Sequence, residues 1–421
     1  MPISEDVLVV GGGLAGATTA LAAAETGASV RLVTYKKSTM RFASGLIDIL
    51  GYTPDGEGPI SNPYDALASL PEAHPYSVVG EEAIREAFGL FDEVAGDSYL
   101  GGHTDANALL PTHGGTVKPT ARYPKSAANG LASDGRDALL VGFESLTDLD
   151  APLAADHMAA AGVPFSVRGV TLEFPVELRA DAKVTRFAKA LDADENRARR
   201  RLADAVEPHL DGAERVGFPA LLGDEHGEEV RADLSATLGV DVFEVPMGPP
   251  SLAGLRLEDR FFAALDEAGV RISSGNPVVD FETDETGDRI EAVFVDRKGQ
   301  RVPYHAGQFV LATGGLVGKG IDSSRERVEE PIFDCHVPHP GDRYEWSDAD
   351  AFGDHAFARF GVVPDEELRP TGSDDDVEFE NLRAAGGVVG GADFAAEKSG
   401  SGISLATGLV AGRNAGTEAS Q

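Results

Sequence analysis

Apolar residues form a continuous run near the N-terminus, and glycines follow it at once. The run 7–10 predicts a buried strand, and the Ala-rich stretch 17–24 predicts a helix. Between them stand Gly11, Gly13 and Gly16 in the G-x-G-x-x-G spacing of nucleotide-binding turns. The pattern therefore predicts a βαβ unit that binds phosphate at the helix N-terminus, where Leu14 and Ala15 contribute free N–H groups.

The second predicted strand, 29–34, ends without the carboxylate that usually binds an adenosine ribose. Thr34 stands at that position, followed by Tyr35, Lys36 and Lys37. A hydroxyl can still bind a ribose. The two lysines are more typical of a solvated loop than of a site for a 2′-phosphate. The phosphate-binding half of the motif is therefore strong and the adenosine-binding half is weak.

Strand and helix patterns continue along the chain. Strands are predicted at 138–143, 164–170, 240–245, 270–273, 276–283 and 290–296, and helices at 151–161, 184–191, 197–210 and 255–268. The stretch 101–132 lacks periodicity and predicts a long connection. We expect residues 1–100 and 246–421 to form one nucleotide-binding domain, with 101–245 inserted as an α/β cap domain.

Glycines also mark the C-terminal part. The predicted strand 308–313 ends in a turn with Thr313 and Gly314, and Gly386 and Gly387 follow a second short segment. Gly400, Ser401 and Gly402 then open a helix that runs to 413. This layout is typical of two-dinucleotide-domain flavoproteins with a Rossmann-like FAD/NAD(P)-binding fold. In these proteins the last helix directs its N-terminus at the flavin.

Several short segments, in order along the chain, resemble the B-type subunit of the anaerobic glycerol-3-phosphate dehydrogenase. They are 41–50, 54–56, 74–77, 249–251 with Gly254 and Arg256, 330–332, 360–362, 368–370 and 380–391. The resemblance implies a bound FMN, a separate FAD-bearing catalytic subunit and an iron–sulfur, membrane-associating subunit. Together these subunits oxidise sn-glycerol 3-phosphate to dihydroxyacetone phosphate and pass electrons toward quinone. Thr34 agrees with FMN, which has no adenosine ribose, and FAD is the alternative.

Candidate ligand contacts lie outside the glycine motifs as well. Arg41, Ser44 and Gly45 follow the second strand and are predicted to touch the flavin, unless they form a plain loop. Arg256 and Arg369 are candidates for substrate or anion binding because an arginine fork suits phosphate, although surface ion pairs are an equal alternative. His74, before Pro75, is either an acid–base group or part of a turn.

No residue stands out as the base that substrate oxidation needs, so the catalytic residues stay unknown. The resemblance places that chemistry on the FAD subunit and leaves this chain as a flavin relay. Two other functions stay open: a self-sufficient FAD- or NADP-dependent oxidoreductase, and a scaffold subunit without nucleotide.

Composition limits the partners. The 421 residues include 70 acidic and 36 basic side chains, a net charge of −34 that disfavours nucleic acid and anionic membranes. So acidic a surface is typical of proteins that stay soluble in concentrated salt. Cys335 is the only cysteine, so this chain alone forms no disulfide and no thiolate-bound iron–sulfur cluster. Cys335, His336 and His339 lack a fourth ligand, so no metal is expected.

The chain has neither a signal peptide nor the run of about 18 apolar residues that spans a membrane. We therefore expect a cytoplasmic protein that inserts no segment of its own into a membrane. Any attachment to the inner face of the cell membrane would come through a partner subunit.

Overall fold

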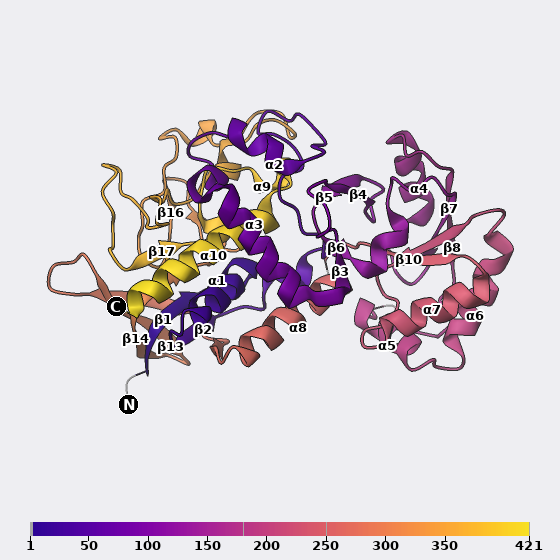
Figure 1. The fold of residues 1–421 in the computed structure, drawn as a ribbon, viewed down its shortest axis with the longest axis horizontal. Coiled ribbons are helices and arrows are strands. Elements are labelled where there is room, and N and C mark those ends of the chain that lie inside the picture. Colours follow the sequence, from indigo (N-terminus) through magenta and orange to yellow (C-terminus); the bar gives the residue numbers. More distant parts are fainter. Residues whose placement is uncertain (1–2, 180, 250, 421) are drawn as a thin grey trace. The chain divides into compact units, whose positions relative to one another are not determined.

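A computed structural model describes residues 3–179, 181–249 and 251–420 (Figure 1). The chain divides into two compact units. The first comprises Met1–Thr39, Asp48–Val94 and Arg260–Gln421, and the second comprises Met40–Ile47 and Ala95–Asp259. The expected divisions, after residues 100 and 245, differ from these. Helix α8 (Leu252–Glu267) contributes residues to both units, so no break in the pattern marks the second boundary.

The first unit is built on a seven-stranded sheet in the order β11-β2-β1-β14-β13-β12, with β17 beside β14. Its strands are β1 (Ile3–Val10), β2 (Val30–Thr34), β11 (Arg271–Ser274), β12 (Val278–Thr283), β13 (Ile290–Arg297), β14 (Gln300–Leu311) and β17 (Leu382–Ala384). Strand β1 is parallel to β2 and β14, and β17 is parallel to β14. Val10 pairs with Val33 and Leu311, so these strands end at one edge of the sheet.

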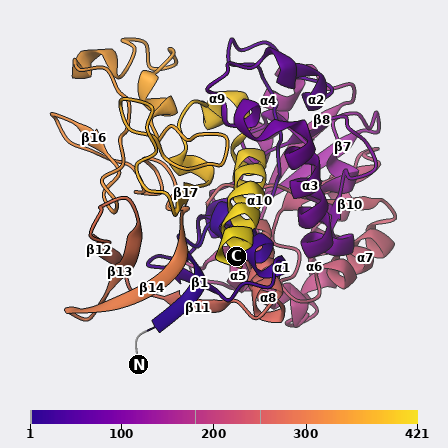
Figure 2. The same ribbon diagram turned by 60° about the vertical axis from the view of Figure 1, so that its left-hand side comes forward.

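Helices α1 (Leu14–Glu25) and α10 (Gly400–Ala419) lie side by side in the first unit (Figures 1 and 2). Three glycines at every fourth position of α10 make this close contact possible. A Cβ on Gly408 would lie 2.7 Å from the Ala15 carbonyl oxygen, and one on Gly412 would lie 2.3 Å from that of Thr19. A Cβ on Gly416 would lie 2.3 Å from Thr26 Oγ1. The glycines therefore form the surface of α10 that receives α1.

Further elements complete the first unit. Helix α3 (Pro75–Ala95) is interrupted at Gly80, whose φ is 79°. The shorter elements are α2 (Pro63–Ala66), α9 (Phe394–Glu397), β15 (Asp322–Ser323) and β16 (Val328–Glu329). Within the described ranges, no helix is both long and apolar enough to cross a membrane.

The second unit contains a parallel four-stranded sheet in the order β10-β9-β7-β8. Its elements are β7 (Ala138–Phe143), α4 (Ala151–Ala160), β8 (Val167–Leu172), α5 (Val184–Asp192), α6 (Ala198–Val206), β9 (Arg215–Pro219), α7 (Gly227–Leu238) and β10 (Asp241–Val245). The stretch 101–132 is not the long connection that its lack of periodicity predicts. It contains the hairpin of β4 (Ala108–Pro111) and β5 (Val117–Thr120), and β6 (Tyr123–Pro124) pairs with β3 (Tyr99–Leu100).

The strand order in the second unit reverses between β7 and β9, where open α/β sheets commonly bind ligands. Aromatic rings occupy the ends of these strands. Phe143 stacks on Phe218 at a centroid distance of 6.5 Å, and Phe174 lies edge-on to Phe143 at 5.1 Å. All three rings are buried. This position is therefore packed as core.

Candidate functional site

The first turn of α1 has no side chain that pairs with its N–H groups. Gly13 is the N-cap, no side chain caps the helix, and its first turn holds no acidic residue. Ala17 is the first residue whose N–H bonds back along the helix, to the Gly13 carbonyl at 3.0 Å. The preceding N–H groups and the positive end of the helix dipole favour an anion.

The three motif glycines differ in what surrounds them. Gly11 has φ +123°, and a Cβ there would lie 2.0 Å from the Ala312 carbonyl oxygen. A Cβ on Gly16 would lie 1.8 Å from the Gly11 carbonyl oxygen. For Gly13, the one neighbour within 4 Å would be Thr39 Oγ1 at 3.3 Å. Gly11 and Gly16 are thus required by the packing of the chain, whereas Gly13 leaves space before the helix.

Four segments from distant parts of the sequence meet at this point. A Cβ on Gly386, whose φ is +75°, would lie 2.5 Å from Ala15 Cβ and 3.6 Å from Ser404 Oγ in α10. A Cβ on Gly387 would lie 3.1 Å from the Gly315 nitrogen. The first turn of α1, the second turn of α10, the turn after β14 and the turn at 386–387 therefore surround one place.

Thr313, in the turn after β14, carries a buried hydroxyl oxygen without a hydrogen-bond partner in the structure. Leaving such a group unsatisfied costs about 1–3 kcal/mol. A polar ligand group would remove that cost. The unpaired hydroxyl and the uncapped α1 N-terminus both fit a bound nucleotide.

Thr34 is buried at the end of β2. Its hydroxyl donates to the Lys36 carbonyl at 2.9 Å, and a Cβ on Gly12 would lie 2.7 Å from its oxygen. The hydroxyl hydrogen is therefore used within the chain. Only the acceptor capacity of Thr34 is left for a ribose.

The carboxylate of Asp48 binds the start of α10, a contact that no sequence motif predicts. The Ser401 N–H donates to Asp48 Oδ1 at 3.0 Å, and the Ser401 hydroxyl donates to the same oxygen. A Cβ on Gly402 would lie 2.2 Å from the Tyr76 hydroxyl. Ser401 thus contacts Asp48, and Gly402 contacts Tyr76. The flavin contacts predicted for Gly400, Ser401 and Gly402 stay predictions. The pairing joins residues 353 positions apart, so no local pattern signals it.

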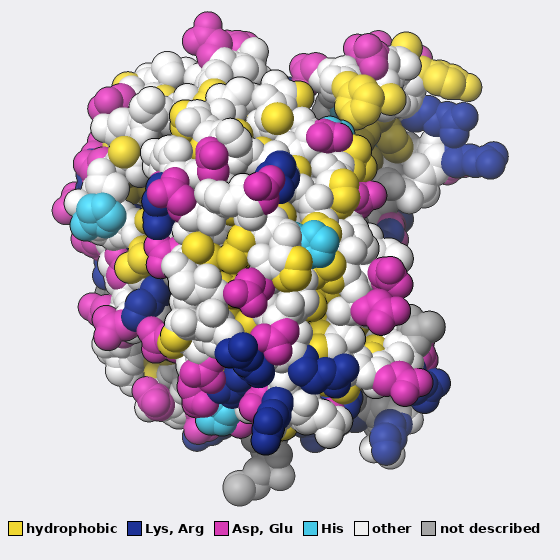
Figure 3. Space-filling model, turned by 90° about the vertical axis from the view of Figure 1, so that its right-hand side faces the viewer, with side chains coloured by type: hydrophobic (Ala, Val, Ile, Leu, Met, Phe, Trp, Pro, Cys, Tyr) yellow, Lys and Arg dark blue, Asp and Glu magenta, His cyan; other side chains and the backbone are white. Residues whose placement is uncertain are grey.

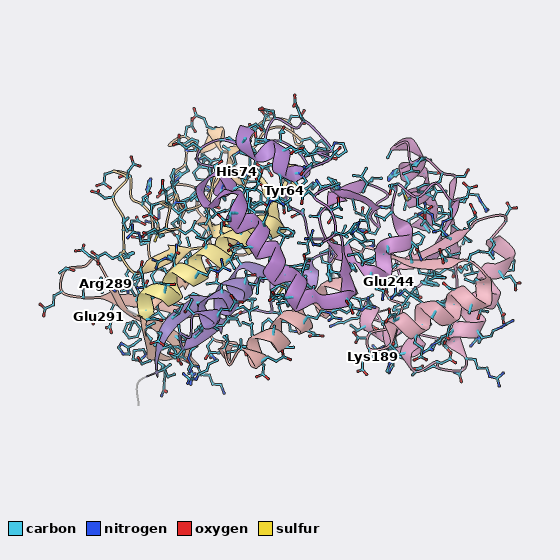
Figure 4. All side chains as sticks on the ribbon, viewed as in Figure 1. Tyr64, His74, Lys189, Glu244, Arg289 and Glu291 are labelled. Carbon is cyan, nitrogen blue, oxygen red and sulfur yellow. The ribbon has the colours of Figure 1, made fainter. Side chains whose placement is uncertain are left out.

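His74, labelled in Figure 4, is fully buried, and both of its ring nitrogens take part in hydrogen bonds. Nδ1 accepts from the Tyr76 N–H at 3.1 Å, which leaves Nε2 to donate to Glu397 Oε2 at 3.0 Å. Ser399 Oγ donates to the same Glu397 oxygen at 3.1 Å. His74 therefore holds the segment before α10 in place and offers no free nitrogen to a substrate.

The predicted anion-binding arginines pair with carboxylates of the chain itself. Arg256 contacts Glu244, which Figure 4 labels in the second unit, at 2.7 Å, and Arg369 contacts Asp365 at 2.8 Å in the first. Burial alone would raise the pKa of Glu244, but the Arg256 charge and hydrogen bonds hold that pKa below its ordinary value. An anion would have to compete with these carboxylates, so both phosphate roles stay predictions.

The loop predicted to touch the flavin belongs largely to the second unit. Arg41 forms an ion pair with Glu258 at 3.2 Å, and the Leu46 N–H donates to Ser44 Oγ at 3.4 Å. A Cβ on Gly45, whose φ is +80°, would lie 2.8 Å from Ala253 Cβ. These contacts account for the loop's conformation, and its flavin contacts stay predictions.

In the part of the chain that the structure describes, no three His, Cys, Asp or Glu residues are placed to hold a metal ion. Cys335 is buried, and burial raises the pKa of its thiol well above the ordinary value.

The phosphate turn, the parallel strands β2, β1, β14 and β17 and the converging glycines are typical of a flavin-nucleotide-binding protein, and the FAD binding domain family matches residues 6–403. A Halobacterium salinarum protein, named as the probable B-type subunit of anaerobic glycerol-3-phosphate dehydrogenase, is 60% identical over 420 residues, 98% of each chain. Its Yersinia pestis counterpart, named without "probable", is 30% identical over 96% of each chain. The chain belongs to the family of B-type subunits of anaerobic glycerol-3-phosphate dehydrogenase.

Among solved structures, 3-ketosteroid delta1-dehydrogenase from Sterolibacterium denitrificans aligns with a TM-score of 0.47 at 12% identity. The alignment covers 99% of this chain and 100% of that one.

The family matches confirm the resemblance seen in the sequence and the flavoprotein fold class. The family is one of flavin-dependent oxidoreductases. The matches do not support the preference for FMN, because the matched domain family is defined by FAD binding.

Proposed function

We propose that this chain is the flavin-bearing B-type subunit of an anaerobic glycerol-3-phosphate dehydrogenase. Such a complex oxidises sn-glycerol 3-phosphate to dihydroxyacetone phosphate. The observation that carries the proposal is the 60% identity, over 98% of both chains, with a protein named for that role. The uncapped α1 N-terminus supports it, because such a helix end suits the phosphates of a flavin nucleotide.

FAD is the proposed cofactor, since the family that matches residues 6–403 binds it. The N–H groups of the first α1 turn would hold its phosphates, and Thr313 would donate to it or accept from it. Thr34 would contact the ribose as an acceptor. When bound, the flavin supplies an acceptor for two electrons. The residues of this chain orient it and exclude water.

Electrons would leave this chain through partners. Its single cysteine cannot hold a thiolate-bound iron–sulfur cluster. We propose a separate FAD-bearing catalytic subunit and an iron–sulfur, membrane-associating subunit, which would pass electrons toward quinone. The protein would be cytoplasmic, or peripheral to the inner face of the cell membrane through the latter subunit.

The acidic surface supports the proposal that the protein works in concentrated salt. Asp and Glu side chains are spread over the face drawn in Figure 3 and do not gather in one patch. A net charge of −34 disfavours anionic membranes and nucleic acid as direct partners.

The first experiment is to purify the full chain in concentrated salt, record its absorption spectrum and identify the nucleotide released on denaturation. We expect FAD. Release of FMN would show that the cofactor is FMN and would keep the relay function. A chain that takes up neither flavin would refute the proposal and favour a scaffold subunit without nucleotide.

Gly13→Val tests the phosphate turn, because its side chain would fill the space before α1. We expect flavin affinity to fall by about tenfold or more, with the fold retained. Gly341→Val is the matched control, since nothing lies within 4 Å of a Cβ at that glycine. If both variants bind flavin equally well, the flavin phosphates do not bind at this turn.

A turnover assay distinguishes an electron-relay subunit from a self-sufficient enzyme. The chain alone should not oxidise sn-glycerol 3-phosphate with a dye acceptor, and it should do so when combined with its two partner subunits. Turnover by the isolated, FAD-loaded chain would favour the self-sufficient oxidoreductase.

A further inference from the structure

The hydroxyl of Thr407 joins the last helix to the turn at 386–387. Thr407 lies in the second turn of α10 and is fully buried. Its Oγ1 accepts from the Gly386 N–H at 2.8 Å and donates to the Ile403 carbonyl at 2.5 Å. The hydroxyl is therefore held on both sides, and its acceptor bond is the one that leaves the helix.

The acceptor bond of Thr407 is the unusual one of the two. A threonine inside a helix commonly donates to the carbonyl four residues earlier. Thr18 in α1, which is also fully buried, donates in this way to the Leu14 carbonyl at 2.9 Å, and within the described ranges its hydroxyl makes no second hydrogen bond. The extra bond of Thr407 reaches a residue 21 positions away. It therefore serves the turn and not the helix.

Gly386 lies between the two helices of the first unit. It begins a short 3₁₀ turn, Gly386–Val388, which contacts both α1 and α10. Its φ is +75°, and a Cβ on it would lie 2.5 Å from Ala15 Cβ. The preceding Ala385 N–H donates to the Leu311 carbonyl at the end of β14, at 2.9 Å. The chain thus leaves the sheet at Gly386, and Thr407 fixes the path that it takes.

This turn forms one wall of the candidate nucleotide site. A Cβ on Gly387 would lie 3.1 Å from the Gly315 nitrogen in the turn after β14. Without the Thr407 oxygen, the turn of the flavin-free chain can shift until the Gly386 N–H reaches water. Flavin binding then requires the turn to return and to bury that N–H without a partner, which is unfavourable.

We propose that Thr407 is a positioning residue for the flavin, whose hydroxyl holds the turn at 386–387 in the conformation that flavin binding requires. The inference rests on the proposed flavin binding. Thr407 acts through Gly386 and does not need to touch the flavin. Loss of its acceptor oxygen should therefore lower the flavin affinity more than the stability of the flavin-free fold.

The test is a titration of the flavin that the purified chain releases, FAD as proposed, into the flavin-free full chain in concentrated salt. Thr407→Val keeps the size and branching of the side chain and removes the hydroxyl. Flavin affinity should fall by about five- to a hundredfold, which is about 1–3 kcal/mol at 1.4 kcal/mol per tenfold. Thr407→Ser keeps the hydroxyl and should bind the flavin nearly as the wild type does.

Thr18→Val is the matched control, because it removes a buried hydroxyl that bonds within α1. Denaturant unfolding of the flavin-free variants is measured beside the titrations. Both valine variants should lose similar amounts of stability, and Thr18→Val should keep the flavin affinity of the wild type.

Affinity and stability together separate positioning from general damage. The inference is wrong if Thr407→Val binds the flavin as tightly as the wild type, or if Thr18→Val weakens binding by the same factor. It is also wrong if Thr407→Ser binds no better than Thr407→Val. If Thr407→Val does not fold, Thr407→Ala is compared with Thr407→Ser, since both lack the methyl group and only Ser has the hydroxyl; equal affinities would overturn the inference. A wild-type chain that binds no flavin would instead refute the proposed function.

Discussion

Replacing Gly412 by Ala should destabilise the first unit even though Ala favours helices. Ala is better than Gly in a helix interior by about 1 kcal/mol. At this position the new Cβ would lie 2.3 Å from the Thr19 carbonyl oxygen and 2.9 Å from Ala22 Cβ, so α10 and α1 must separate. Overpacking of this kind costs about 1–3 kcal/mol, and it acts on backbone atoms that cannot rotate away. We expect Gly412→Ala to be less stable than the wild type by about that amount.

Gly89 in α3 provides the control, because nothing lies within 4 Å of a Cβ there and its backbone is helical. Gly89→Ala should gain up to about 1 kcal/mol. The assay is denaturant unfolding at constant high salt, followed by the circular dichroism of the helices. The reasoning is refuted if both variants shift the midpoint in the same direction, or if Gly412→Ala is as stable as the wild type.

Three further outcomes are expected. Burial raises the pKa of Glu330 to about 7 from the ordinary 4.5, so the protonated form stabilises the fold. That stability is full below about pH 4.5 and is lost as the pH rises through 7, and relative to Glu330→Gln the wild type should lose about 3 kcal/mol over this range in unfolding measurements. Arg256→Met leaves the buried Glu244 carboxylate without its ion pair and should cost about 3–5 kcal/mol of unfolding free energy, much of which Glu244→Gln in the same chain should restore. No recovery in the double variant would contradict the pairing. Thr313→Val removes a buried hydroxyl without a partner, so the flavin-free protein should gain about 1–3 kcal/mol of unfolding free energy while flavin affinity falls in a binding titration; equal affinities would exclude Thr313 from the site.

Elements with a strong local pattern are predictable from this sequence. The run 138–143 is apolar almost throughout and forms β7 with those bounds, because a parallel strand covered on both faces is buried at every position. The predicted strand 308–313 is β14, which begins earlier, at Gln300. Its first half pairs with β13 across a turn at Gly299, and its residues there vary in burial.

Other elements differ from the prediction for identifiable physical reasons. Helix α7 buries Val230, Leu234 and Leu238, a spacing that is typical of a helix, but these are its only buried residues, so its apolar stripe is narrow. Helix α3 contains Gly80 and Gly89, which weaken the helical pattern. Strand β9 is short and ends in Pro219.

In the candidate site, local signals identify the glycines, whereas long-range pairings have no such signal. Gly11, Gly13 and Gly16 are recognisable by their spacing. The contacts of Asp48 with Ser401 and of His74 with Glu397 join residues more than 300 positions apart. A single sequence carries no pattern that connects such partners, so it does not assign Asp48 to the start of α10.

The packing of α10 on α1 also has a consequence for synthesis of the protein. Strand β1 lies between β2 and β14, and α1 packs against α10, which the ribosome makes almost 400 residues later. Until β14 has been made the apolar first strand lacks one of its two neighbours, and until α10 has been made the Ala-rich helix lacks the partner that covers it. Nascent chains in this state expose surfaces that aggregate. We therefore expect the nucleotide site to form only after α10 has been synthesised, and deletion of α10 to yield insoluble protein.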